Sequence, residues 1–137
     1  SQLSGLYAGI SEMLQALADS GYRLAVVSNK LQAGVTELQQ YYFSSWIQVA
    51  VGERPEVRRK PAPDMVLQAV NELGADLRET VYVGDSDVDI ETARQCGIPC
   101  ISVLWGFRDR DFLESCGATH FAATPQDIVT FVQKGLE

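Results

Sequence analysis

Three aspartates stand close together in the segment VYVGDSDVDIETA, residues 81–93, directly after a short apolar run. Asp85, Asp87 and Asp89 gather like charge at the point where a hydrophobic strand is expected to end. Carboxylate oxygens suit a hard cation such as Mg²⁺, and Asp89 lies one helical turn beyond Asp85, so both could face one site. The alternative is that one of residues 85–87 caps a helix, and this segment alone favours neither interpretation.

Two other segments carry polar residues that could act with these acids. Ser28 and Asn29 follow the apolar run RLAVV, where a hydroxyl and backbone N–H groups could hold a phosphate or simply cap a helix. Lys60 lies in RRKPAPD, whose prolines stiffen the loop, and it could be a fixed cation or a solvated surface lysine. An anion binder, a cation and a metal-binding acid pair are together what phosphoryl transfer requires.

Between these segments the pattern alternates helix and strand along the whole chain. Short apolar runs predict strands at 23–29, 46–52, 80–85, 99–106 and 119–123. Helical spacing and terminal glycines predict helices at 9–21, 31–43, 64–74, 87–97, 109–117 and 124–135. Repeated strand–helix units predict one α/β domain over residues 1–137, a Rossmann-like parallel sheet in a three-layer α/β/α sandwich. The carboxyl ends of such strands meet at one edge, where ligands bind.

Composition narrows the classes of function. The 137 residues include 11 basic and 18 acidic side chains, and the net charge of −7 disfavours binding to nucleic acid. The basic residues of ERPEVRRK, residues 53–60, suit a small anionic ligand better than a duplex. No run is long and apolar enough to cross a membrane and no secretory signal is visible, so we expect a cytoplasmic protein without a membrane partner. The three cysteines and the single histidine, His120, are expected to be structural.

Three segments carry a family resemblance. In this order and separation, VVSNK (26–30), RKPAPD (59–64) and VYVGDSDVDI (81–90) resemble motifs II, III and IV of the haloacid dehalogenase (HAD) superfamily. The closest likeness is to its phosphoglycolate-phosphatase-like branch, which the tail from Cys100 to Ile128 also resembles. The fold that this resemblance implies is the three-layer HAD core.

The resemblance also assigns roles to the candidate residues. It implies that Ser28 and the Asn29 backbone bind the substrate phosphoryl group. It implies that Lys60 is a catalytic residue that neutralises the nucleophile and the transferring group. Asp85 would ligate Mg²⁺, and Asp89 would support the metal through water or by orienting the site.

One motif of the family is missing from these residues. Family members begin with a strand ending in DxDxT, whose first aspartate is the nucleophile and whose second is the general acid/base. The D-x-D triplets here belong to motif IV or to residues 109–111. In the family that strand lies between the strands that end here at Ser28 and Asp85, so we expect an incomplete HAD core with a gap in its sheet. We expect the chain to be the C-terminal part of a longer protein, without its DxDxT strand and its cap.

The implied activity is that of a Mg²⁺-dependent phosphomonoesterase, acting through an aspartyl-phosphate on a small phosphorylated metabolite such as phosphoglycolate. These residues alone are expected to be inactive, because they lack the nucleophile. The alternatives are a HAD phosphomutase, and a non-catalytic phosphate- or metal-binding module or one subunit of a split enzyme. A dehalogenase is disfavoured because it needs no metal site. The gap could also recruit a second chain, so self-association through the incomplete sheet is a further expectation.

Overall fold

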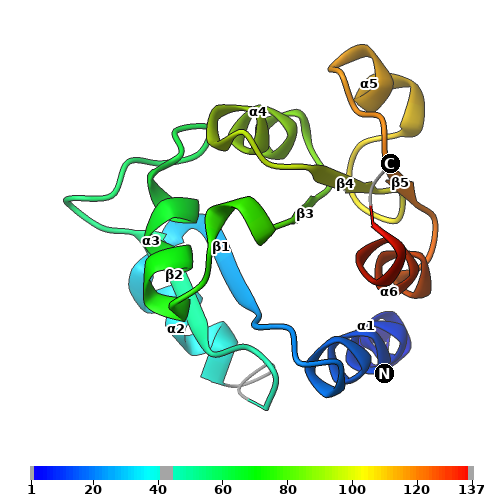
Figure 1. Ribbon diagram of the computed structural model, residues 1–137, viewed down its shortest axis with the longest axis horizontal. Helices are drawn as coiled ribbons and strands as arrows, with labels where there is room; N and C mark the ends of the chain where they lie inside the picture. The colour runs from blue at the N-terminus through cyan, green and yellow to red at the C-terminus, as the bar shows by residue number, and fades with distance from the viewer. Residues whose placement is uncertain (1, 41–44, 136–137) are drawn as a thin grey trace.

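The computed structural model describes residues 2–40 and 45–135, and it confirms the alternation of helices and strands (Figure 1). The helices are α1 (Gln2–Asp19), α2 (Gln32–Leu38), α3 (Asp64–Leu73), α4 (Asp87–Cys96), α5 (Arg110–Ser115) and α6 (Pro125–Lys134), with a 3₁₀ turn, η2, at Leu77–Glu79. The strands are β1 (Ala25–Leu31), β2 (Val49–Glu53), β3 (Tyr82–Gly84), β4 (Cys100–Val103) and β5 (Phe121–Ala122).

Two helix boundaries differ from the prediction by several residues. The prediction that the first helix begins at Gly9 is wrong, because α1 already begins at Gln2 and packs along α6. Gly9 lies in that contact, where a Cβ atom would be 3.3 Å from Cγ of Pro125. Glycine weakens a helix in isolation, and here tertiary packing overrides that preference. The second helix ends at Leu38, earlier than predicted, and residues 41–43 of the predicted helix lie outside the described residues.

The strands form two parallel sheets rather than one continuous sheet. In the first, β1 pairs with β2, and Val27 lies beside Val51. In the second, the order is β3, β4, β5, and Gly84 of β3 lies beside Ser102 of β4. Among the described residues, no strand pairs with both β1 and β3. The gap predicted in the middle of the sheet is therefore present.

Helix α3 holds the two sheets side by side. Met65 and Ala69 pack with the buried valines of β2 in one core cluster. Val66 and Val70, on the neighbouring row of the same helix, pack with Tyr82 of β3 in a second cluster. Residues four apart lie on one helical stripe, so adjacent stripes of α3 contact different sheets. This helix thereby bridges strands that are not hydrogen-bonded to one another.

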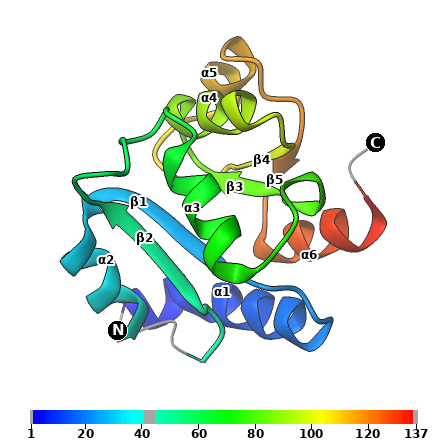
Figure 2. The same ribbon diagram turned by 60° about the vertical axis from the view of Figure 1, so that its left-hand side comes forward.

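Helices cover both faces of the strands, as expected for a three-layer sandwich. Figure 2 shows α1, α2 and α6 on one side and α3, α4 and α5 on the other. A third core cluster, formed by β4, β5 and α6, includes Ile101 and Ile128 and contacts Met13 of α1. Within residues 2–40 and 45–135, no helix combines the length and the apolar character needed to span a membrane.

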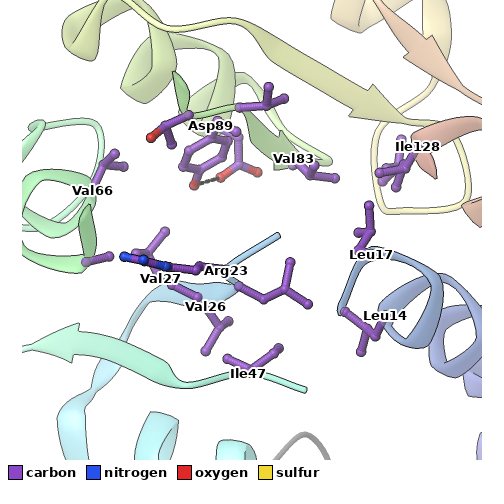
Figure 3. Close-up of a pocket in the computed structure, with 18 of the residues that line it drawn as sticks. Leu14, Leu17, Arg23, Val26, Val27, Ile47, Val66, Val83, Asp89 and Ile128 are labelled. Carbon is purple, nitrogen blue, oxygen red and sulfur yellow. Dashed lines mark hydrogen bonds between the residues drawn. The ribbon is translucent and has the colours of Figure 1, made fainter. Parts of the chain in front are cut away.

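A cavity of about 500 Å³ occupies the space between β1 and β3 (Figure 3). Its walls are mostly apolar and include Val27 of β1 and Val83 of β3. Val83 is 43% exposed although it lies in the middle of its strand, as expected where a strand edge is open. Lys60, Asp85 and Asp89 also line the cavity, so the gap in the sheet and the candidate site are continuous.

Candidate functional site

A closed triangle of hydrogen bonds joins Lys60, Tyr82 and Asp89 beside the cavity. Lys60 Nζ donates to Asp89 Oδ1 at 2.8 Å and to the Tyr82 hydroxyl at 3.0 Å. The Tyr82 hydroxyl donates to the same Asp89 oxygen at 2.6 Å (Figure 3). The side chains of Lys60 and Asp89 are only 14% and 8% exposed, so this ion pair depends on good hydrogen-bond geometry to offset its desolvation. The triangle confirms that Lys60 is a fixed cation rather than a solvated surface lysine.

Asn29 fixes the backbone of Lys60 from the end of β1. Its Oδ1 accepts from the Lys60 N–H at 2.8 Å, and its Nδ2 donates to the Lys60 carbonyl at 3.2 Å. Ser28, the preceding residue, accepts from the Lys30 N–H through Oγ at 3.2 Å, which leaves the hydroxyl hydrogen available to a ligand. The segments predicted to bind phosphate are therefore linked to Lys60 by direct contacts.

The second oxygen of Asp89 organises the start of α4. It accepts from the N–H groups of Asp85 and Ser86 at 3.0 and 3.2 Å, and from the Ser86 hydroxyl at 3.0 Å. Ser86 is the N-cap and forms a capping box with Asp89. The helix-cap interpretation of this acidic segment is therefore correct for Ser86, with Asp89 as its partner. Both oxygens of Asp89 are engaged by protein donors.

Asp85 is the carboxylate that stays available. In the described structure it makes a hydrogen bond only through its backbone N–H, and its side chain lines the cavity. The loop after β4 packs against it, because a Cβ atom on Gly106 would lie 2.4 Å from the Asp85 Cβ. A Cβ atom on Gly84 would likewise lie 2.3 Å from the Asp89 Cβ, so the close approach of these two residues requires glycine.

The arginines before Lys60 contact acidic side chains instead of the cavity. Arg58 Nη2 lies 2.8 Å from Asp64 Oδ1, and Arg59 Nε lies 3.9 Å from Glu53 Oε2. The two arginine side chains are 72% and 61% exposed. Within residues 53–60, Lys60 is therefore the basic side chain that the fold directs to the site.

The protonation states in the triangle follow from its surroundings. Burial alone would raise the pKa of Asp89, but hydrogen bonds from Lys60 and Tyr82 lower it below its usual value, so the carboxylate is ionised. Burial and the charge of Asp89 raise the pKa of Tyr82 far above its usual value, so its hydroxyl stays protonated. Tyr82 therefore donates to Asp89 and accepts from Lys60.

Sequence reasoning missed Tyr82 and Gly106 as site residues. A tyrosine inside a buried apolar run was a usable signal for the first, because a buried hydroxyl needs a hydrogen-bond partner. Gly106 carried no such signal, since its importance comes from contact with a residue distant in sequence. His120 packs edge-on against Phe131, with 6.1 Å between ring centroids. The three cysteines are free thiols; Cys96 and Cys100 are partly buried, whereas Cys116 is exposed.

The donor set fits Mg²⁺ through Asp85. Mg²⁺ is usually held by one or two carboxylates together with substrate oxygens and water. Among the described residues the Asp85 carboxylate has no hydrogen-bond partner, whereas Asp89 orients the loop that carries it. In the part of the chain described, no group of three or more His, Cys, Asp or Glu side chains could hold a metal ion. A metal at Asp85 would therefore take its other oxygens from substrate, water or further protein.

Known proteins share this arrangement of segments. The chain is 36% identical over 130 residues to the probable phosphatase IndB of Dickeya dadantii, covering 93% of this chain and 54% of that protein. It is 31% identical over 121 residues to a phosphoglycolate phosphatase of Mesorhizobium japonicum, covering 85% of this chain and 53% of that protein. A crystal structure from Lactobacillus delbrueckii, assigned as a phosphoglycolate phosphatase, superposes with a TM-score of 0.88 and 40% identity over 90% of this chain and 52% of that chain.

The chain thus spans about half the length of the curated relatives it matches. The sequence model of the family described as haloacid dehalogenase-like hydrolase matches residues 1–103 of this chain. That range contains Ser28, Lys60 and Asp85. With three ordered motifs converging on one cavity, the chain belongs to the haloacid dehalogenase-like hydrolase family.

Proposed function

We propose that these residues form part of a Mg²⁺-dependent phosphomonoesterase that acts on a small soluble phosphate ester, with phosphoglycolate as the first candidate. The observation that carries the proposal is the buried Lys60–Asp89 ion pair beside the Asp85 carboxylate, which has no partner among the described residues, all three lining one cavity. A fixed cation next to a free carboxylate can bind phosphoryl oxygens and a divalent metal at the same place. The relatives named phosphoglycolate phosphatase support this class of substrate.

Each residue has a distinct part in this proposal. The Ser28 hydroxyl and the Asn29 backbone N–H bind oxygens of the substrate phosphoryl group. Lys60 directs its remaining N–H at the same group and offsets the charge that develops during transfer. Asp85 holds Mg²⁺, which when bound neutralises phosphoryl oxygens, and Asp89 keeps both Asp85 and Lys60 in place. A cytoplasmic location belongs to the same proposal and agrees with free thiols.

The proposal also includes a strand from outside these 137 residues that occupies the cavity between β1 and β3. The facing edges of β1 and β3 have no strand partners in the described structure, and the walls between them are mostly apolar. An extended apolar segment would fit this space. An aspartate at the carboxyl end of that strand would lie beside Lys60. Its carboxylate oxygen would attack phosphorus, the ester P–O bond would break, and a second aspartate would protonate the leaving alcohol. Water would then cleave the aspartyl-phosphate and release inorganic phosphate.

A fusion protein tests this function. The part of the Lactobacillus delbrueckii protein that this chain does not cover is placed ahead of Ser1, and phosphate release from phosphoglycolate is measured with Mg²⁺. We expect turnover by the fusion and none by the 137 residues alone. Asp85→Asn in the fusion should lower kcat by on the order of a hundredfold or more, whereas Asp111→Asn, at an exposed position of α5, should leave it unchanged. A folded fusion without turnover, or turnover by the chain alone, would contradict the proposal.

A second candidate function is that of a binding module or one subunit of a split enzyme, and the open cavity is the observation that favours it. A second chain could then occupy the cavity in place of a covalently attached strand, and a second copy of this chain is one form of that. Light scattering after size-exclusion chromatography distinguishes the forms, because a self-associating chain gives twice the monomer mass. A binding module would be favoured if the monomer bound inorganic phosphate in a Mg²⁺-dependent way and no phosphate ester were hydrolysed, even by the fusion.

A further inference from the structure

Tyr82 is the member of the triangle to which the proposed function gives no part. Its hydroxyl accepts from Lys60 Nζ at 3.0 Å and donates its hydrogen to Asp89 Oδ1 at 2.6 Å. Since Tyr82 is only 7% exposed, water contributes little to these contacts.

We propose that Tyr82 is a positioning residue, which fixes the direction in which the Lys60 ammonium presents its free N–H to the cavity. The inference rests on the proposed function and deepens it. An ammonium group has three N–H donors, and the contacts with Tyr82 and Asp89 use two of them. Without the hydroxyl, a single Asp89 oxygen would hold the ammonium, which could then rotate about that one contact. Two acceptors define an orientation that one acceptor does not.

Packing alone does not account for this tyrosine. Its ring belongs to the apolar cluster that Val66 and Val70 of α3 form with Ala93 and Ile98. A phenylalanine would fill the same space in that cluster without burying a polar atom. The hydroxyl is therefore useful only for its two hydrogen bonds, and both go to residues of the site.

Direct evidence can come from the chain as it stands. We expect a slowly exchanging hydroxyl proton for Tyr82 in the NMR spectrum of the 137-residue chain, and protected ammonium protons for Lys60. Tyr82→Phe should speed exchange of the Lys60 ammonium protons about tenfold, the scale of one lost hydrogen bond to a charged group. Tyr22→Phe is the matched control, because within the described part of the chain the Tyr22 hydroxyl bonds only to the Val132 carbonyl, at 3.4 Å. Unchanged exchange in Tyr82→Phe would overturn the inference, as would a freely exchanging Tyr82 hydroxyl in the unsubstituted chain.

Kinetics of the fusion protein supply the second measurement. Tyr82→Phe should lower kcat about tenfold with little change in KM, because a misdirected ammonium stabilises the transition state less than it did while bound phosphate keeps its other contacts. In a Lys60→Met background, Tyr82→Phe should have no further effect on kcat, since Tyr82 acts through Lys60. An equal loss in both backgrounds, or an unchanged kcat, would overturn the inference. If the unsubstituted fusion is inactive, the proposed function fails, and ammonium exchange still decides the role of Tyr82.

Discussion

Replacing Asp89 by asparagine should destabilise the fold far more than the loss of one helix cap. The amide can keep its oxygen toward the N–H groups of Asp85 and Ser86, which preserves the cap. Its NH₂ group then faces the Lys60 ammonium, and a buried cation without its counter-charge costs about 3–5 kcal/mol. Lys60 remains 14% exposed at an open cavity, so we expect the lower limit, about 3 kcal/mol. For a domain of this size that corresponds to a fall in Tm of roughly 12 °C.

The second capping box of the molecule provides a matched control. At the start of α6, Asp127 accepts from the N–H groups of Ala123 and Thr124, as Asp89 does at α4, but it makes no contact with a buried cation. Asp127→Asn should therefore cost only about 0.5 kcal/mol. Urea unfolding followed by circular dichroism measures both variants. If Asp89→Asn cost no more than Asp127→Asn, the buried ion pair would contribute nothing beyond the cap, and the argument for a fixed Lys60 would fail.

The pH dependence of this difference has a defined sign. The pKa of Asp89 is lowered in the folded chain, so its contribution is present above the usual value of 3.8 and is lost as pH falls through the folded value. The free energy of unfolding of the unsubstituted chain should therefore approach that of Asp89→Asn as the solution is acidified below about pH 4. A difference that persisted unchanged into strong acid would show that Asp89 acts by shape and not by charge.

Three further outcomes are expected. The pKa of Tyr82 is raised in the folded chain, so its contribution to the free energy of unfolding is present below the usual value of 10.0 and is lost as pH rises beyond it. Urea unfolding should therefore show a steeper alkaline loss of stability in the unsubstituted chain than in Tyr82→Phe. Gly106→Ala should cost about 1–3 kcal/mol by overpacking, and titration calorimetry should show weaker Mg²⁺ binding, because the new Cβ displaces Asp85. Arg58→Ala should leave the urea midpoint unchanged, since its pair with Asp64 is solvent-exposed and screened.

Much of the fold could be predicted from the pattern of apolar residues in the sequence, because strand and helix periodicity are local properties. Five strands and six helices were predicted, and each has an observed counterpart. The ends of the helices and strands were harder to predict, since they depend on contacts between segments that are distant in the sequence. The strand predicted over 99–106 stops at Val103, because Gly106 has to pack against Asp85. The start of α1 was missed for a similar reason, because Gly9 lies inside the helix where it packs on Pro125 of α6.

The residues of the candidate site also differ in whether the sequence alone could identify them. Residue types and order were enough to select Lys60 and Asp85, because fixed cations and strand-end carboxylates are chemically recognisable in a sequence. The part of Asn29 was not, since its side chain holds the backbone of Lys60, which lies 31 residues later in the chain. The acidic segment posed a choice between a helix cap and a cation site; the structure confirms the cap, and the cation site stays a prediction. Ser86 and Asp89 make the cap, and that cap leaves Asp85 free.

A gap in the centre of a sheet raises the question of what keeps its two sides in register. Hydrogen bonds within each sheet cannot do so, because the described strands pair only within their own sheets. Two of the connections that cross the gap lie next to the site: the adjacent stripes of α3, which pack on β2 and β3, and the polar chain from Asn29 through Lys60 to Asp89. The first is apolar and non-directional, so it sets proximity, whereas the second is directional and sets alignment. The residues that would handle phosphate are therefore also the ones that align the strands around the cavity, and a strand entering it would meet Lys60 already in place.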